Sequence, residues 1–115
     1  MFKLVIHISD KNLWQNAINN AHNTIKALHG SFDIRVIANG NAVQGYLDPE
    51  IRQKITDISH PNLQFIACNN SLVGQNITKE ALNPADAKVT NIHIVPVAII
   101  AIVEAQHEGF GYIKP

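Results

Sequence analysis

The stretch QFIACNNS, residues 64–71, decides the fold, because an apolar run stops within it at a row of polar residues. Residues 64–68 are rich in apolar, aromatic and branched side chains, and this composition predicts a β-strand. The run shows no regular polar alternation, so we expect both faces of the strand to be covered. Such a strand is typical of a parallel sheet, in which chemistry lies at the carboxyl end, where Cys68 stands.

Three similar runs lie elsewhere in the chain, at residues 3–8, 33–38 and 91–95. Each is short and mainly apolar and is followed by Ser, Asn or Pro, which commonly end a strand. We therefore expect each run to be a strand of the same sheet. Residues 111–113 are expected to add a fifth, short edge strand.

The segments between these runs have the periodicity of helices. Apolar residues recur every three or four positions from Trp14 to Leu28, and helices are also expected after Pro49 and from Val97 to Glu108. The alternation of strands and helices predicts an α/β fold with a mostly parallel, five-stranded sheet covered by helices on both faces. Residues 83–90 are expected to form a loop.

The bulk composition indicates a single domain, residues 1–115, without a strongly charged partner. Lys and Arg together number 9 and Asp and Glu together number 9, so the formal net charge is zero. Nucleic acids and membrane surfaces select clustered positive charge, so we expect neither as a partner. The longest apolar run, residues 94–103, has about half of the ~20 residues that span a bilayer. The single cysteine and the absence of a recognisable targeting segment lead us to expect a cytoplasmic protein with a free thiol.

Cys68 is the strongest candidate for chemistry, because it is the only strong nucleophile among the residues that follow the strands. A thiolate is favoured at the start of a helix, where backbone N–H groups point at the sulfur. We therefore expect Cys68 to be the catalytic residue. The residues expected to bind around it are Asn39, Gly40, Asn69, Asn70 and Ser71.

A purely structural role for Cys68 stays open, because free cysteine is among the most buried residue types. The histidines are expected to be structural. His22 and His29 lie about 10 Å apart along one helix, too far to share a metal, and His7 and His93 could be neighbours across the sheet. The sequence has no zinc-site spacing, dinucleotide fingerprint or phosphate loop, so we expect neither a metal nor a cofactor.

The last predicted helix carries more apolar surface than one face of a sheet covers. Its apolar residues are Val97, Ile99, Ile100, Ile102 and Val103. A helix that is apolar all round is buried, and in a chain this small its far side calls for a second subunit. We therefore expect a homo-oligomer with the Val97 to Val103 helix at the interface, although neighbouring loops could cover the same surface.

Several segments resemble one known family over essentially the whole chain. Residues 65–72, with the pattern Ala-Cys-x-Asn-Ser-Leu around Cys68, are similar to the cysteine-containing segment of the DsrE/DsrF-like family. Residues 3–8 and 36–40 resemble earlier segments of that family. Residues 108–115, which carry the pattern Gly-x-x-Tyr-Ile-Lys-Pro, resemble its tail.

This resemblance implies a Rossmann-like or flavodoxin-like three-layer α/β/α fold and a homo-oligomer, as a trimer or a hexamer. It also implies a link to sulfur handling, because some members of the family carry sulfur as a persulfide on a cysteine and pass it to a partner. Cys68 is the matching position. The chain has no second cysteine, so sulfur donor and acceptor proteins would supply the other sulfur atoms.

The leading prediction is therefore a small cytoplasmic sulfur-relay protein, of the sulfurtransferase or sulfur-carrier type, with a persulfide on Cys68. The alternative is a non-catalytic oligomeric binding or regulatory module, with a small-ligand site at the carboxyl ends of the strands. A redox sensor is the least favoured function, since the chain has neither a resolving cysteine nor a dinucleotide fingerprint.

Overall fold

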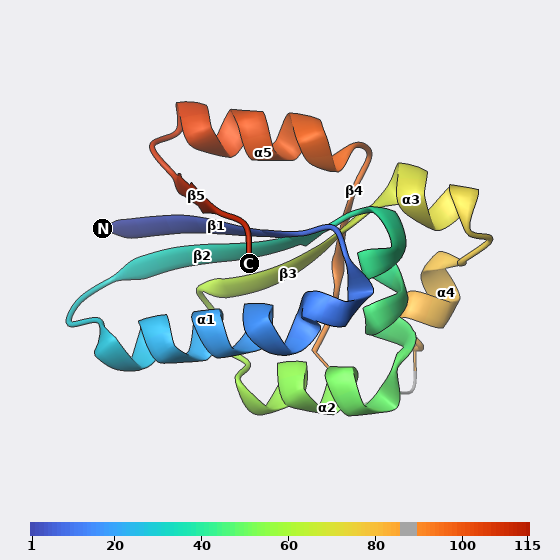
Figure 1. Ribbon diagram of the computed structural model, residues 1–115, viewed down its shortest axis with the longest axis horizontal. Coiled ribbons are helices and arrows are strands. Elements are labelled where there is room, and N and C mark those ends of the chain that lie inside the picture. Colours follow the sequence, from blue (N-terminus) through green and yellow to red (C-terminus); the bar gives the residue numbers. More distant parts are fainter. Residues whose placement is uncertain (86–89) are drawn as a thin grey trace.

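The computed structural model describes residues 1–85 and 90–115, in which five strands form one sheet (Figure 1). The strands are β1 (Phe2–Ile8), β2 (Phe32–Ala38), β3 (Leu63–Cys68), β4 (His93–Val95) and β5 (Gly111–Ile113). The α-helices are α1 (Trp14–Ala27), α2 (Pro49–Asp57), α3 (Asn69–Gly74), α4 (Lys79–Leu82) and α5 (Ala98–His107). Two 3₁₀ helices, η1 (Lys11–Leu13) and η2 (Gly40–Leu47), precede α1 and α2. Part of the loop predicted at 83–90, residues 86–89, lies outside the described residues.

All five strands run parallel, in the order β4-β3-β2-β1-β5. The predicted α/β fold is confirmed, and the short fifth strand lies at an edge beside β1. The strand predicted at 91–95 begins two residues late, at His93. The reason is local: the side-chain amide of Asn83 bonds both the N–H and the C=O of Ile92, each at 2.8 Å, and takes the place of a strand partner.

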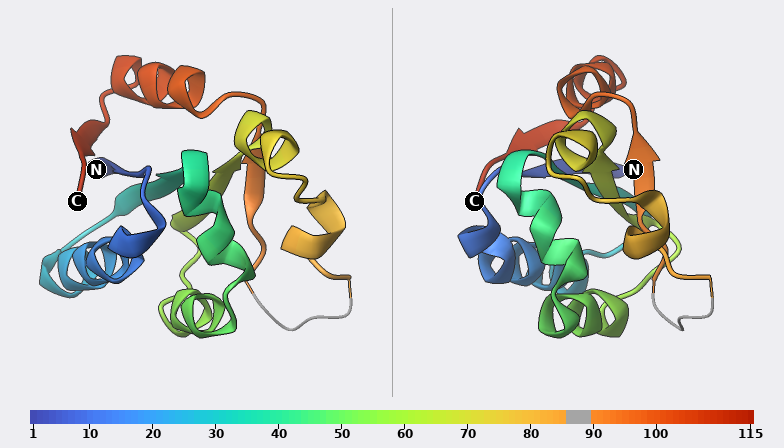
Figure 2. Two further views of the ribbon diagram at one scale, coloured as in Figure 1. Left: turned by 45° about the vertical axis from the view of Figure 1, so that its right-hand side comes forward. Right: turned by 90° about the vertical axis from the view of Figure 1, so that its right-hand side faces the viewer.

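The strand order explains the layers of the fold. From β1 to β4 the chain moves across the sheet in one direction, so right-handed crossovers place the intervening helices on one face. The chain then returns across the whole sheet from β4 to β5, and α5 lies alone on the opposite face (Figure 1; Figure 2). We call the face of the sheet that α1 and α2 cover the two-helix face, and the opposite face the α5 face.

The two-helix face carries most of the hydrophobic core. Alternate strand residues such as Ile6, Val36 and Phe65 point into it and are almost completely buried. Trp14, the first residue of α1, packs edge-on against Tyr46 with ring centroids 4.9 Å apart, and its Nε1–H donates to the carbonyl of Ala42 at 2.8 Å. These contacts bury the predicted apolar stripe of α1 and leave its indole nitrogen satisfied.

Local sequence signals set the helix ends. The Asp48 carboxylate accepts the N–H of Glu50 at 2.9 Å, and Pro49 occupies the first turn of α2, where its missing N–H costs nothing. At the end of α5, Gly109 has φ +93°, and the N–H of Phe110 donates to the carbonyl of Ala105 at 3.0 Å. This is a Schellman motif, and it turns the chain back towards β5.

Arg52 of α2 is a buried cation that the sequence pattern does not reveal. Its side chain is 7% exposed, and its guanidinium donates to the carbonyls of Tyr46, Leu82 and Thr90 at 3.1, 2.6 and 2.7 Å. Burial lowers the pKa of Arg52 from its usual value. All three partners are main-chain oxygens from different segments. Arg52 therefore connects η2, the end of α4 and the segment before β4.

The α5 face is covered only in part. Ala98, Ile102 and Ala105 of α5 are buried against Val5, Ile37 and Ile66 of the sheet. The outer side of the helix exposes three of the five apolar residues noted in the sequence: Ile99 is 63% exposed, Ile100 56% and Val103 45%. The described loops therefore leave this surplus uncovered. In the described ranges, every helix is too short or too polar to cross a membrane.

Candidate thiol site at the carboxyl ends of the strands

Cys68 is the last residue of β3, and the connections that follow β3 and the neighbouring strand β4 leave on opposite faces of the sheet. The connection after β3 packs on the two-helix face, where Leu72 of α3 and Leu82 of α4 join the core. The connection after β4 goes to the other side and becomes α5. In open α/β sheets, a crevice forms between two neighbouring strands whose connections leave in opposite directions, and ligands bind there. Cys68 lies at such a point.

The sulfur of Cys68 is held by the start of α5. Its Sγ accepts the backbone N–H of Ala98, the first residue of that helix, at 3.3 Å. Cys68 faces the α5 side of the sheet with Ile37, Ile66 and Ile102. The residue is only 4% exposed, so its sulfur has little contact with solvent in the single chain. The cause is α5, which packs directly over the end of β3.

The surroundings of the thiol nevertheless favour its anionic form. Burial raises the pKa of Cys68, but the N–H of Ala98 lowers it, as do the N–H and hydroxyl of Ser71 and the N–H of Asn70. With all of these contributions, the pKa of Cys68 lies below the ordinary value of a thiol. This is the electrostatic effect predicted for a cysteine between helix starts, since N–H dipoles that point at a sulfur stabilise negative charge on it.

Hydrogen bonds tie three strand ends together around Cys68. The N–H of Gly40, which follows β2, donates to Ser71 Oγ at 2.8 Å. The N–H of Asn70 donates to the carbonyl of Pro96, between β4 and α5, at 3.3 Å. Gln75 Nε2 donates back to the carbonyl of Gly40 at 2.8 Å. The turns after β2, β3 and β4 are therefore fixed relative to the sulfur.

The predicted binding residues divide into two groups. Gly40, Asn70 and Ser71 lie around Cys68 as expected, although Asn70 contributes its backbone rather than its side chain. Asn39 turns away and places its Oδ1 2.9 Å from Nε2 of His7. The side chain of Asn69 is half-buried and forms no hydrogen bond with any described residue.

The possible pairing of His7 with His93 is wrong. His7 lies on β1 and His93 on β4, and two strands, β2 and β3, separate them. His7 instead places Nδ1 2.6 Å from the hydroxyl of Tyr112 on β5. Among the described residues, no three His, Cys, Asp or Glu side chains gather as a metal site would require.

Sequence reasoning missed the groups that come from far along the chain. Ala98 and Pro96 contribute only main-chain atoms, so their side chains give no signal. His7 and Tyr112 belong together because β5 pairs with β1 in the register Val5 to Tyr112. Alternation along the two strands places both side chains on the α5 face, but that deduction needs the strand order.

Comparison with known proteins bears on the fold. No protein-family model matches the chain, and no curated protein matches it in sequence. One solved structure, described as that of the protein of unknown function MTH1491 from Methanobacterium thermoautotrophicum, superimposes with a TM-score of 0.85. The match covers 100% of both chains at 25% sequence identity. Over its whole length, the chain is thus similar in fold to this compact α/β protein.

Proposed function

We propose that the protein is a small sulfur carrier that holds a persulfide on Cys68 and passes the outer sulfur to a partner. One observation carries the proposal: Sγ of Cys68 accepts the N–H of Ala98 at 3.3 Å at the start of α5. A thiolate is the nucleophile in sulfur transfer, and this contact stabilises it. The resemblance of residues 65–72 to the DsrE/DsrF-like family supports the same function, and membership in that family is part of the proposal.

The proposed reaction needs one cysteine and no change in overall oxidation state. The Cys68 thiolate attacks the outer sulfur of a donor persulfide, R–S–SH. The bond from Sγ to that sulfur forms as the donor S–S bond breaks, and the donor leaves as R–S⁻. An acceptor thiolate then attacks the outer sulfur of Cys68–S–SH, which releases Cys68 as a thiolate. The proton of the outer S–H stays with the transferred sulfur in both steps.

The geometry sets a condition on the donor. Cys68 is 4% exposed, so a donor has little room at the sulfur. An S–S bond is about 2.05 Å long, so the outer sulfur of the persulfide extends beyond the position that Sγ occupies. We expect loading by small persulfides to exceed loading by bulky ones, because the buried sulfur leaves little room for a bulky donor.

Mass spectrometry of the intact protein tests the proposal directly. After exposure to cysteine persulfide and removal of excess reagent, wild-type protein should gain one sulfur atom, and dithiothreitol should remove it. Cys68→Ser keeps a side chain of similar size and should gain none. Equal gain by Cys68→Ser, or no gain by a wild-type protein whose thiol is reactive, would exclude the carrier function.

A binding or regulatory module without catalysis is the second candidate, and the burial of Cys68 favours it. In that case Cys68 is a wall of the site, and the strand ends around Gly40 and Ser71 hold a small ligand. The rate of alkylation by iodoacetamide against pH separates the two. A midpoint below about 8.5 supports an activated thiolate, and an unreactive thiol supports the binding module.

The variant Ser71→Ala tests whether the Ser71 hydroxyl contributes to the lowered pKa of Cys68. The Ser71 hydroxyl lowers the pKa of Cys68 and accepts the N–H of Gly40. Its removal should move the alkylation midpoint to higher pH while the fold persists, because the Ala98 contact to Sγ remains. An unchanged midpoint would mean that Ser71 does not stabilise the thiolate.

Partners and location are further parts of the proposal. We propose a homo-oligomer, a trimer or hexamer, in which the Val97 to Val103 helix contributes to the interface and a second copy covers Ile100, which is 56% exposed. The zero net charge supports association, because it leaves little repulsion between copies. Sulfur donor and acceptor proteins are implied by the reaction. A free thiol is best preserved in a reducing cytoplasm, which is the proposed location.

A further inference from the structure

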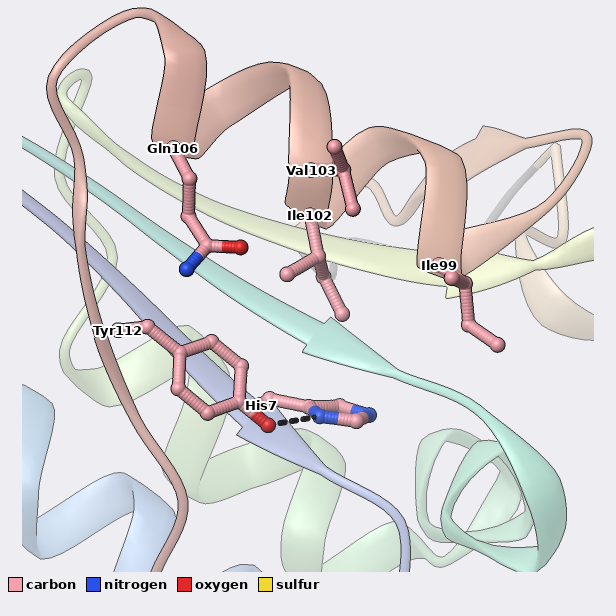
Figure 3. A pocket seen from close by; sticks show the side chains of 6 residues that line it. All are labelled: His7, Ile99, Ile102, Val103, Gln106 and Tyr112. Atoms are coloured by element: carbon pink, nitrogen blue, oxygen red, sulfur yellow. Dashed lines mark hydrogen bonds between the residues drawn. The ribbon is translucent and has the colours of Figure 1, made fainter.

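A pocket distinct from the sulfur of Cys68 lies between α5 and the β1–β5 edge of the sheet (Figure 3). Its volume is about 300 Å³, at the lower end of the range for small-molecule sites. It is lined by His7, Ile99, Ile102, Val103, Gln106 and Tyr112. In Figure 3 the side chains of Ile102 and Gln106 extend from α5 towards the sheet, and Tyr112 and His7 lie opposite them.

Three polar side chains form a chain of hydrogen bonds at this pocket. Oδ1 of Asn39 lies 2.9 Å from Nε2 of His7, and Nδ1 of His7 lies 2.6 Å from the Tyr112 hydroxyl. A carbonyl oxygen only accepts, so Nε2 carries a proton and donates it to Asn39. In the neutral ring Nδ1 is then an acceptor, and the Tyr112 hydroxyl donates to it.

In this arrangement the Tyr112 hydroxyl donates its proton to Nδ1 of His7, and the lone pairs of its oxygen stay available to accept another hydrogen bond. Tyr112 is 40% exposed and lines the pocket. The oxygen is therefore a hydrogen-bond acceptor held in place by its own donation to His7.

The remaining walls define the chemistry of the occupant. Three of the six lining residues are aliphatic, and none of the six is Asp, Glu, Lys or Arg. An ion would lose its hydration here without gaining an opposite charge, so an uncharged molecule fits better. The aliphatic walls suit an apolar body, and the Tyr112 oxygen suits a single hydroxyl.

We propose that this pocket binds a small, uncharged molecule with an apolar body and a hydroxyl group, which donates a hydrogen bond to Tyr112. The inference goes beyond sulfur transfer and does not depend on it, because Cys68 does not line the pocket.

Phenol, toluene and benzoate are suitable probes, since they share a ring and differ in hydroxyl and charge. Titrations of the protein are followed by ¹H–¹⁵N NMR spectra. Phenol should bind about fivefold more tightly than toluene, the effect of one hydrogen bond, and benzoate should bind most weakly. The shifts should centre on β1, β5 and α5. Equal binding of phenol and toluene, tightest binding of benzoate, or shifts elsewhere would overturn the proposal.

Variants test the role of the Tyr112 oxygen. The double variant His7→Leu/Tyr112→Phe removes both acceptors, so the preference for phenol should fall below about twofold. His7→Leu alone keeps the Tyr112 oxygen and should retain the preference, which makes it the matched control. A double variant that still prefers phenol would overturn the proposal.

Two further variants keep the test decisive. If the double variant does not fold, Ile99→Trp, at a side chain that is 63% exposed, should fill the pocket and weaken binding of all three probes at least tenfold. Unchanged binding would overturn the proposal. Cys68→Ser should bind phenol as wild type does, so failure of sulfur loading and failure of ligand binding are separate results.

Discussion

The two faces of the sheet carry different kinds of side chain, although the same strands build both. On the two-helix face, Trp14, Tyr46 and Phe65 are each about 1% exposed and pack among aliphatic residues. On the α5 face, the same strands present His7, Arg35 and Cys68 beside apolar residues. One helix covers this face (Figure 2), and a pocket lies at the β1–β5 edge.

The difference indicates that the sheet separates most of the hydrophobic core from the residues of the two proposed sites. A face sealed by two helices tolerates only apolar or fully bonded groups, because an unpaired polar group there costs free energy. A face under a single helix leaves room for groups that exchange protons or bind molecules. Mutations on the first face should therefore change the free energy of unfolding, and mutations on the second should change reactivity or binding.

The largest expected effect compares one aromatic residue from each face. Phe65→Ala should lower the free energy of unfolding by about 3–5 kcal/mol, because it opens a cavity at a side chain that is 1% exposed. Tyr112→Ala, at a side chain that is 40% exposed, should cost about 1 kcal/mol or less. Urea unfolding followed by circular dichroism measures both. Similar losses for the two variants would contradict the contrast between the faces.

The next effect concerns the buried cation beside the two-helix face. Arg52→Met should cost about 1–3 kcal/mol, because it leaves the carbonyls of Tyr46, Leu82 and Thr90 without their donor. Arg52→Lys keeps the charge but cannot bond three oxygens in a planar fork, so it should recover only part of the loss. The same unfolding measurement applies. A fully stable Arg52→Met would show that these carbonyls find other partners.

A smaller effect on stability should depend on pH and arise on the α5 face. The pKa of Cys68 is lowered in the folded protein, so the unfolded chain binds more protons between the folded pKa and the unfolded value of about 8.5. The contribution is fully present above about pH 8.5 and is lost as the pH falls through the folded pKa. The stability of wild type relative to Cys68→Ala should thus rise with pH. A difference that falls or stays constant would mean that the thiolate is not favoured by the fold.

The smallest effect on stability is expected on the outer side of α5. Ile100→Glu changes a side chain that is 56% exposed, so the unfolding free energy of the isolated chain should change by about 0.5 kcal/mol or less. The proposed oligomer should nevertheless dissociate, because a charge would lie in an apolar interface. Light scattering after gel filtration measures the molar mass. A wild-type protein that is monomeric, or a variant with unchanged mass, would exclude this face as the interface.

Strands and helices were predictable because each leaves a local signal. The strand of residues 64–68 and its polar end at Asn69 were read from composition and periodicity, and the structure places β3 at Leu63–Cys68. The end of α5 at Gly109 was likewise predictable, since glycine readily adopts a positive φ there. The nearness of Gly40, Asn70 and Ser71 to Cys68 followed from one rule about strand ends.

The remaining features depend on contacts between distant segments. Cys68 is buried because α5, which starts thirty residues later, packs over it, and no local pattern gives the position of that helix. Arg52 looks like an exposed helical residue, and only the positions of η2, α4 and the segment before β4 surround it with carbonyls. His7 meets Tyr112 because β5 is placed beside β1, which the alternation of elements leaves undetermined.

The pairing of β5 with β1 has a consequence for how the protein folds. Leu4 pairs with Gly111, which lies 107 residues later in the chain, so the outer edge of β1 is closed by a strand that is distant in sequence. Contacts of such long sequence separation form late, because closing the intervening loop costs entropy. We expect amides of β5 to gain protection last when refolding is followed by pulsed hydrogen exchange. Protection of β5 before β3 would contradict this order of assembly.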